Sequence, residues 1–423
     1  MFLHINKLRN LIFPLFFITP IQAFSGGAIL YEISSADTRL ASAGYSSRAQ
    51  DPSTVFTNPA GMSRLCRGVE FGAQTIFQHV HFNPDDATTT SGDDGMASKW
   101  LPSGSFFYVE PYGEKLTFGF GSLGYFGADL SYNHDWVGRY YIQQSLCQGL
   151  SLVPAVSYKV NDCLSFGAGL NIMYAFLKQR SAVNNALDGM DDGYFSLNDT
   201  KFGCGAVFGV LYELSCRTRF GLQYLTKVKL KFEDKPEFNN IGPNLETLLE
   251  DVGIIGSTVN LNVRVPQGFI LSGYHEWSDD LALMLDFGFQ KWSEFQKVIL
   301  SLSDLDGTTF RFLPKYEDTW HAAFGAIWYY NDCLSFSTGV AYDSSAVTNK
   351  ERTLDFPIGE QIRFGAGGRY AKSTSLIFDF SAELQWQGDL LCDVNRGPLA
   401  GRVSGVFENV YGAFLNVNVI YFF

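Results

Sequence analysis

The sequence lacks the long apolar runs of a helical membrane protein. After the N-terminus it contains no run of about 18 or more apolar residues, the length that a membrane-spanning helix needs. It is also poor in positive charge, with 31 lysines and arginines against 43 aspartates and glutamates, a net charge of −12. Recognition of nucleic acid requires a basic surface, so this balance argues against such a partner.

Charged residues of both signs are scarce, at 17% of the chain, where about a quarter is usual in soluble proteins. The aspartates and glutamates fall mostly in predicted loops, where solvation explains them. His79 and His81 share one predicted strand face without a third metal ligand nearby. A hydrolase would need a serine and a histidine held by an acid, and no serine stands out beside His275 or His321. We expect no metal site, no cofactor and no enzymatic activity.

Motifs of redox and nucleotide chemistry are absent or out of context. No CxxC occurs, and the seven cysteines are an odd number, so at least one thiol stays unpaired. Cys163 and Cys333 lie in identical NDCLSF hexapeptides, but on opposite sides of the predicted fold, so we do not expect them to pair. The stretch 119–124 (GFGSLG) matches GxGxxG, yet no βαβ unit surrounds it. Glycines inside a strand more often mark a kink or a close approach.

The sequence is rich in aromatic residues and in alternating segments. Aromatics make up 16% of the chain. In residues 164–174 (LSFGAGLNIMY), large apolar side chains alternate with small or polar ones. A soluble sandwich would turn the apolar face inward, whereas a membrane barrel would turn it toward lipid. Periodicity alone does not separate the two folds.

Three further features favour the barrel. The last strand carries an apolar row that ends at the final residue, Phe423, as is common in bacterial outer-membrane barrels. Short turns alternate with long polar connections, the layout of porin-type barrels, and the chain has no βαβ rhythm. We predict fourteen strands, at residues 69–80, 102–111, 115–126, 149–160, 163–177, 202–214, 217–232, 262–276, 281–298, 320–330, 333–342, 361–371, 374–386 and 409–423.

The first 66 residues differ from the rest. Residues 1–23 have a basic start, a short apolar core and a small residue at the end, and we interpret them as a secretory signal peptide. Residues 24–66 are small, polar and unstranded, and a barrel this wide needs a plug. The prediction is an all-β, fourteen-stranded antiparallel transmembrane barrel over residues 67–423, plugged by an N-terminal hatch at 24–66. One amphipathic helix is expected at 244–252, in an external loop.

The hatch segment resembles the FadL/TodX family of outer-membrane transporters for long-chain fatty acids and other hydrophobic compounds. Its most specific piece is the box Asn58-Pro59-Ala60-Gly61, within residues 51–62 (DPSTVFTNPAGM). The resemblance covers essentially the whole mature chain. Further matching pieces are residues 31–35 (YEISS), 136–140 (WVGRY), 153–159 (VPAVSYK), 218–224 (TRFGLQY), 291–295 (KWSEF), 316–320 (YEDTW) and 339–343 (GVAYD).

The resemblance implies passive uptake in the outer membrane. Cargo would be caught by external loops at about 178–201 and 233–261 and would move to a pocket above the hatch. It would then leave sideways, after the hatch moves, at an inward kink in the third strand. The box Asn58 to Gly61 would act at this gate, and Gly119, Gly121 and Gly124 would form the kink. Implied partners are hydrophobic small molecules, outer-membrane lipid with lipopolysaccharide, and the barrel assembly machinery.

The sequence leaves the identity of the cargo undecided. Arg180, Arg311 and Lys315 lie near predicted external strand ends and could meet the carboxylate of a fatty acid, although a solvated or lipopolysaccharide-facing cation is the plainer interpretation. The alternatives are an aromatic-hydrocarbon channel of the same family and a structural or adhesive surface barrel. The last would lack a continuous apolar pocket between hatch and wall.

Overall fold

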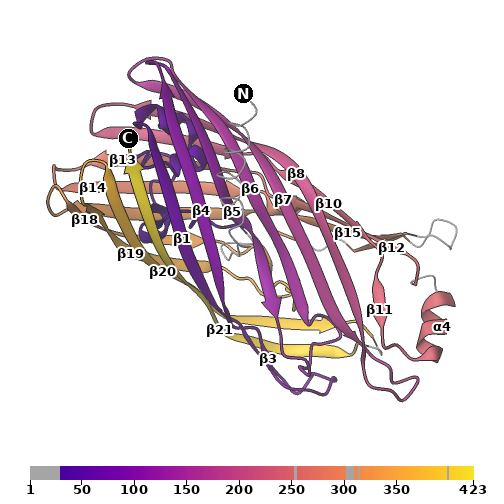
Figure 1. Cartoon of the computed structure of the whole chain (residues 1–423). Helices are drawn as coiled ribbons and strands as arrows, with labels where there is room; N and C mark the ends of the chain where they lie inside the picture. Colours follow the sequence, from indigo (N-terminus) through magenta and orange to yellow (C-terminus); the bar gives the residue numbers. More distant parts are fainter. Residues whose placement is uncertain (1–28, 252–254, 302–308, 313–314, 398–399) are drawn as a thin grey trace, which may run out of the picture.

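The computed structural model describes residues 29–251, 255–301, 309–312, 315–397 and 400–423. The predicted signal peptide lies outside these residues. The chain forms a closed antiparallel barrel of fourteen strands, as predicted (Figure 1). Among the described residues, no helix is both long and apolar enough to cross a membrane. The wall strands, in order around the barrel, are β1 (Gly68–His79), β4 (Lys99–Tyr112), β5 (Leu116–Ser131), β6 (Gln144–Lys159), β7 (Leu164–Val183), β8 (Gly193–Glu213), β9 (Thr218–Leu225), β13 (Gly268–Glu276), β14 (Leu281–Gln290), β17 (Thr319–Tyr329), β18 (Leu334–Asp343), β19 (Gln361–Ala371), β20 (Leu376–Asn395) and β21 (Arg402–Phe422).

The first and last strands close the wall. β1 pairs with β21 from Gly68↔Phe422 to His79↔Tyr411. The backbone N–H of the terminal Phe423 donates to the carbonyl of Arg67, 3.0 Å away. This unbroken ladder leaves no open strand edge at the seam, which a membrane barrel cannot tolerate.

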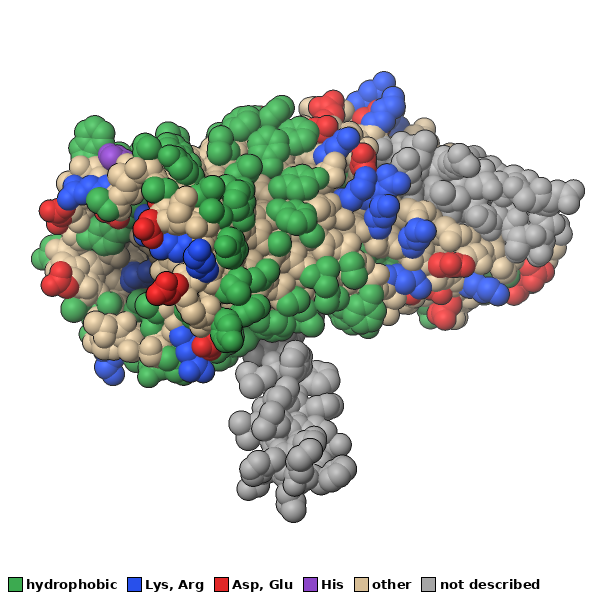
Figure 2. Space-filling model, turned by 90° about the horizontal axis from the view of Figure 1, so that it is seen from above, with side chains coloured by type: hydrophobic (Ala, Val, Ile, Leu, Met, Phe, Trp, Pro, Cys, Tyr) green, Lys and Arg blue, Asp and Glu red, His purple; other side chains and the backbone are tan. Residues whose placement is uncertain are grey.

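Alternation decides which side of each strand faces lipid. In β7, Phe166 and Leu170 are exposed on the outer face, whereas Ser165 and Asn171 are buried toward the lumen. The same arrangement recurs around the barrel and produces a belt of apolar side chains on the outer surface (Figure 2). Such a band marks the hydrocarbon core of the membrane.

The short turns lie at the end of the barrel where the C-terminus lies. In the repeated hexapeptides, Asn161 Oδ1 and Asn331 Oδ1 each accept two backbone N–H groups, those of the next cysteine and leucine, all at 2.9 Å. Such Asx turns reverse the chain tightly. All seven cysteines carry free thiols, including Cys163 and Cys333.

Three predicted strands are interrupted, which corrects their expected extents. The segments 217–232, 262–276 and 281–298 each divide where they leave the wall. Beyond the breaks they form a separate four-stranded sheet of β10 (Val228–Asp234), β12 (Thr258–Val265), β15 (Gln296–Ser301) and β16 (Thr309–Phe312). The breaks contain the proline Pro266 and the 3-10 turn η3 (Trp292–Glu294). Pro266 lacks the N–H that a ladder hydrogen bond needs, and the backbone of a 3-10 turn is not extended.

Shorter elements complete the outer end. They are β2 (His81–Pro84), β3 (Gly95–Met96), β11 (Glu237–Asn239) and helix α4 (Pro243–Asp251). Helix α4 confirms the predicted amphipathic segment, and its Leu245 is buried. Val252, the last residue of that prediction, lies outside the described residues.

Residues 29–65 lie inside the barrel, toward the end with the short turns (Figure 1). They contain helix α2 (Ser35–Arg39), helix α3 (Thr54–Thr57) and the 3-10 helix η2 (Pro59–Arg64). The hydroxyl of Ser34 accepts the N–H of Asp37 and caps α2. Almost every side chain of this segment is buried against the wall, so it fills the lumen as a plug would. We refer to residues 29–66 as the hatch.

Candidate functional site: the hatch and the apolar column above it

The hatch is joined to the wall by buried charges, and the first group, which we call the upper clamp, centres on Arg363 of β19. Arg363 Nη1 lies 2.5 Å from Glu32 Oε1 of the hatch, and its Nε lies 3.3 Å from Asp343 and 3.7 Å from Glu383. All four side chains are buried. The expectation that acidic residues lie in solvated loops is therefore wrong for these positions. Lumen-facing strand positions are where a barrel can carry charge without meeting lipid.

A second group, the lower clamp, centres on Asp379 of β20. Arg39 of the hatch and Arg369 of β19 lie 2.9 and 2.7 Å from Asp379 Oδ2. Arg369 also lies 3.5 Å from Asp51 of the hatch. Buried charges are tolerated only when paired in this way, so each clamp fixes both the position and the orientation of the hatch.

A serine, a histidine and an aspartate stand in line beside the upper clamp. Ser42 Oγ lies 3.0 Å from His321 Nε2, and His321 Nδ1 lies 2.8 Å from Asp343 Oδ1. The expectation that no serine accompanies His321 is thus wrong, because the fold brings together residues 279 positions apart. Ser42 is fully buried and also accepts a hydrogen bond from Arg363 Nη2 at 2.8 Å. The line therefore ties hatch to wall and leaves the hydroxyl no approach for a substrate.

The Asn-Pro-Ala-Gly box forms the start of η2. Asn58 Oδ1 accepts the N–H of Ala60 at 3.1 Å, and Asn58 Nδ2 donates to the carbonyls of Ser46 and Val210 at 2.5 and 3.0 Å. One side chain therefore caps the 3-10 helix and links two parts of the hatch to β8. Pro59 sits at the first helical position, where its missing N–H costs nothing.

Gly61 completes the box by close packing. A Cβ at Gly61 would lie 2.8 Å from both Ala49 Cβ and Thr54 Cγ2. The box thus holds the hatch in a compact shape.

The third wall strand, β5, leaves its neighbour β4 partway up the barrel. Their ladder runs from Tyr112↔Leu116 to Phe106↔Ser122, whereas β5 stays paired with β6 as far as Ser131↔Gln144. Just above Ser122, the β5–β6 register shifts between Gly124 and Phe126. β5 therefore bends away from β4 in its outer half.

The three glycines predicted for the kink have different positions. Gly124 adjoins the register shift. Gly119 and Gly121 lie in the regular ladder below it, where a Cβ at Gly119 would lie 2.4 Å from Met62 Sδ and 2.7 Å from Val55 Cγ2 of the hatch. Gly119 therefore makes room for the hatch, whereas a Cβ at Gly121 would first meet Phe107 of β4, at 3.1 Å.

The first described residues of the hatch lie where β5 bends. Leu30 N–H donates to the carbonyl of Tyr125 at 2.7 Å, and Ile29 forms a β-bridge with Phe126. The Leu30 side chain packs among Ile76, Leu101 and Phe414 of β1, β4 and β21. The N-terminal end of the hatch thus covers the inner side of the place where the wall ladder stops.

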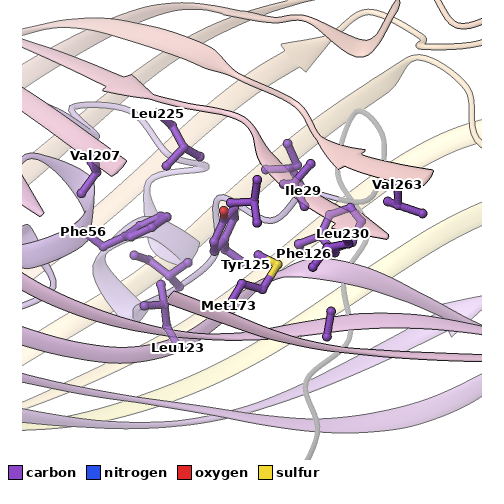
Figure 3. Close-up of a cluster of buried hydrophobic side chains, with 14 of the residues drawn as sticks. Ile29, Phe56, Leu123, Tyr125, Phe126, Met173, Val207, Leu225, Leu230 and Val263 are labelled. Carbon is purple, nitrogen blue, oxygen red and sulfur yellow. The ribbon is translucent and has the colours of Figure 1, made fainter. Parts of the chain in front are cut away.

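A continuous set of buried apolar side chains, which we call the apolar column, runs from the hatch to the four-stranded sheet of β10, β12, β15 and β16. We call that sheet the outer sheet. Figure 3 shows its central part, in which side chains from the hatch, β5, β7, β8, β9, β10 and β12 converge. The labelled members are Ile29, Phe56, Leu123, Tyr125, Phe126, Met173, Val207, Leu225, Leu230 and Val263.

A small cavity lies beside the column, directly above the hatch. Its volume is about 30 Å³, room for about two water molecules. Tyr31 and Phe56 of the hatch face wall residues across it, among them Leu225 and Gln290, and Gln290 Nε2 donates to the Tyr31 hydroxyl at 2.6 Å. None of the described residues lining it is charged. Any larger apolar molecule must push hatch and wall side chains apart to enter.

Tyr31 joins this cavity to the upper clamp. Its ring stacks on His321, with the centroids 4.6 Å apart, and the Arg363 guanidinium lies 5.0 Å from its centroid. The next residue, Glu32, is the hatch carboxylate of the clamp. Sequence reasoning missed both roles, although the charge of Arg363 at a lumen-facing strand position was a usable signal.

The three predicted ligand cations are not gathered at this cavity. Arg180 of β7 lies 4.3 Å above the Tyr194 ring of β8. Lys315 follows β16 and is exposed. The backbone of Arg311 pairs with Ile299 in the outer sheet, and its side chain lies outside the described residues.

The fold and the site together define an outer-membrane barrel with a plugged lumen and a column of apolar side chains above the plug. Residues 16–405 match the family of outer-membrane transport proteins OMPP1/FadL/TodX. The chain belongs to this family and is an outer-membrane protein that transports hydrophobic compounds.

Known proteins of similar sequence are named as long-chain fatty acid transport proteins and outer membrane proteins. The long-chain fatty acid transport protein of Escherichia coli K12 is 25% identical over 425 residues, which cover 91% of this chain and 92% of that protein. Outer membrane protein P1 of Haemophilus influenzae is 25% identical over 442 residues, covering 92% and 94%.

Solved structures confirm the fold. A Pseudomonas aeruginosa FadL homologue superposes with a TM-score of 0.84 at 21% identity, over 94% of this chain and all of that chain. The Pseudomonas putida toluene transporter TodX gives 0.68 at 16% identity, over 94% and 98%.

Proposed function

We propose that this protein takes up long-chain fatty acids passively across the outer membrane. The observation that carries the proposal is the apolar column, whose side chains an acyl chain could displace on its way from the four-stranded sheet to the hatch. Burying an acyl chain among apolar side chains avoids its contact with water. Relatives named as long-chain fatty acid transport proteins, matched over most of both chains, support this cargo. We also propose that the protein performs no chemistry on it.

The proposed route ends sideways, through the wall at β5. The ladder between β4 and β5 stops at Phe106↔Ser122, and Ile29 and Leu30 cover the inner side of that place. Because the cavity above the hatch holds only about 30 Å³, arriving cargo must displace hatch side chains. Displacement of Ile29 and Leu30 would uncover an exit into the outer leaflet. Hatch movement and lateral opening are then one event.

The second candidate cargo is a neutral aromatic hydrocarbon. The uncharged lining of the cavity favours it, because Tyr31, Gln223 and Gln290 supply hydrogen bonds but no cation for a carboxylate. Arg180, Arg311 and Lys315 remain the proposed carboxylate contacts for the fatty-acid version, at the outer end of the path.

Uptake measurements test both versions. Labelled oleate and labelled toluene are supplied to cells that lack their own carrier, with and without this chain. We expect oleate uptake to rise several-fold with the chain present. A rise for toluene alone would favour the hydrocarbon version. Uptake of neither, with the barrel assembled in the membrane, would contradict transport.

A further inference from the structure

Two buried polar side chains beside the apolar column have polar atoms that are left unpaired. Asn171 of β7 and Ser151 of β6 are both fully buried. The Asn171 Oδ1 and the Ser151 Oγ have no hydrogen-bond partner among the described residues. Buried polar atoms in native proteins are nearly always hydrogen-bonded, so each unpaired one calls for an explanation. A ligand that supplies the missing partners is one such explanation.

The two side chains lie on neighbouring strands and border the same apolar space. Ser151 is the register partner of Met173, which is two residues from Asn171. The Cα atoms of such diagonal neighbours in an antiparallel pair are about 7–8 Å apart. Met173 is itself a member of the apolar column (Figure 3). We call Asn171 and Ser151 the polar pair.

The polar pair lies between the outer sheet and the cavity above the hatch. Asn171 is the register partner of Gly205 of β8. A Cβ at Gly205 would lie 2.9 Å from Val228 Cγ2, so the outer sheet reaches this level. The Asn171 Nδ2 donates to the Tyr125 hydroxyl at 2.7 Å, and Tyr125 lines the cavity. Cargo that moves from the outer sheet to the cavity therefore passes Asn171.

The unpaired atoms are complementary to a protonated carboxyl group. The Asn171 Oδ1 can only accept a hydrogen bond, whereas the Ser151 hydroxyl can donate one. A protonated acid has one O–H to donate and one carbonyl oxygen to accept, but a carboxylate has acceptors alone. The column is built of apolar side chains, and the described lining of the cavity is uncharged. An acid buried without a cation is stable only in its neutral form.

We propose that the polar pair binds the head group of a fatty acid in its protonated, neutral form. The acid would donate its O–H to Asn171 Oδ1 and accept the Ser151 hydroxyl at its carbonyl oxygen. The carboxylate takes up one proton from water before it enters the column and returns the proton when its head group meets water again. This inference rests on the proposed function and specifies the chemical form in which the cargo passes. Arg180, Arg311 and Lys315 would then meet the carboxylate before this step.

Infrared spectroscopy of bound oleate tests the protonation state. The full chain, purified in detergent, is loaded with oleate that carries an isotopic label at its carboxyl carbon. The pH is set so that the same oleate is ionised in protein-free micelles. We expect the bound ligand to show the carbonyl band of the protonated acid. Carboxylate bands alone would overturn this inference and leave the proposed function standing, whereas absence of bound oleate would overturn both.

Titration of two double variants tests the residues. N171L/S151A replaces the polar pair by apolar side chains, and the matched control N198L/S91A makes the same changes at exposed positions. We expect N171L/S151A to bind oleate about tenfold more weakly than wild type, because two hydrogen bonds to the ligand are lost. The control should match wild type. Octadecene, a hydrocarbon with as many carbons as oleate, should bind all three proteins equally well.

Two results of the titration would overturn the proposal. The first is equal oleate affinity of N171L/S151A and wild type, which would mean that the polar pair does not contact the head group. The second is an equal loss of affinity for oleate and octadecene, which would mean that the substitutions disturb the acyl path instead. Heat-modifiable migration on gels checks assembly. Should the double variant fail to assemble, Ser151→Ala alone replaces it, with an expected loss of severalfold in oleate affinity and none for octadecene.

Discussion

The two halves of the lumen are held together by different forces. Around the hatch, arginines are buried against carboxylates, as in the clamps at Arg363 and Asp379. Above the hatch, the apolar column is held mainly by the packing of apolar side chains, although the Tyr125 hydroxyl also accepts a hydrogen bond from Asn171. Both regions are buried, yet they differ in what can replace their contacts.

This difference indicates how a plugged barrel can open to one class of molecule. An apolar cargo can take the place of apolar side chains at little cost, because the hydrophobic effect is non-directional. It cannot replace the partner of a buried charge, whose isolation is expensive. Cargo can therefore loosen the hatch from above, while the clamps keep the lumen closed to everything else. The predictions below test that division, from the largest expected effect to the smallest.

Loss of the upper clamp should have the largest effect. Arg363→Met leaves Glu32 and Glu383 buried without their partner, which costs about 3–5 kcal/mol. We expect the barrel to lose its folded gel mobility at a lower temperature and cells to become sensitive to vancomycin. The control is Arg402→Met, because Arg402 and Asp393 form an exposed pair, at 43% and 53% exposure, worth about 0–1 kcal/mol. If both variants lost folded gel mobility at the same temperature, the upper clamp would stabilise the barrel no more than an exposed ion pair does.

Steric displacement of the hatch should come next. Gly339 of β18 approaches the hatch backbone so closely that a Cβ would lie 1.9 Å from Leu40 O. Gly339→Ala should therefore cost about 1–3 kcal/mol by overpacking and raise permeability in the same vancomycin assay. Gly273→Ala serves as the matched control, since its nearest atom would be Phe220 Cε1 at 3.6 Å. A harmless Gly339→Ala would mean that the hatch shifts freely against this strand.

The Asn-Pro-Ala-Gly box offers a prediction of intermediate size. Asn58→Ala leaves the buried carbonyls of Ser46 and Val210 without this donor, at a cost of about 1–3 kcal/mol. We expect oleate uptake to fall while the barrel still assembles. Asn83→Ala, which removes an exposed bond to Glu408, should leave uptake unchanged. Failure of Asn58→Ala to assemble would make the box structural rather than part of the gate.

Much of the wall could be predicted because the alternation of apolar and polar residues within one strand shows which of its faces is turned to lipid. The alternation in residues 164–174 is read from neighbouring residues alone. The same rule misled at residues 217–232. Tyr224 faces lipid and Val228 faces the lumen, so the face reverses at the break. Both residues are apolar and even-numbered. The alternation of apolar residues at even-numbered positions therefore continues across the break, and the sequence gives no sign that the strand ends there.

The clamps could not be predicted in the same way. Glu32 and Arg363 are 331 residues apart. The sequence around either residue does not identify the other as its partner. The charge of Arg363 between outward-facing Ile362 and Phe364 does predict a polar lumen. Which hatch residue meets it depends on the path of the whole plug. The Ser42–His321 contact was missed for the same reason.

The smallest expected effect separates hatch from wall within the apolar region. Tyr31→Phe removes the bond from Gln290, and Tyr125→Phe removes the bond from Asn171, at 2.6 and 2.7 Å. Each loss costs about 1 kcal/mol, so oleate affinity measured by titration should change by less than about tenfold in both. Both rings remain, and with them the stack of Tyr31 on His321. If Tyr31→Phe alone abolished uptake, the hydroxyl rather than displacement of the apolar ring would control the hatch, and the two halves of the lumen would not be mechanically separate.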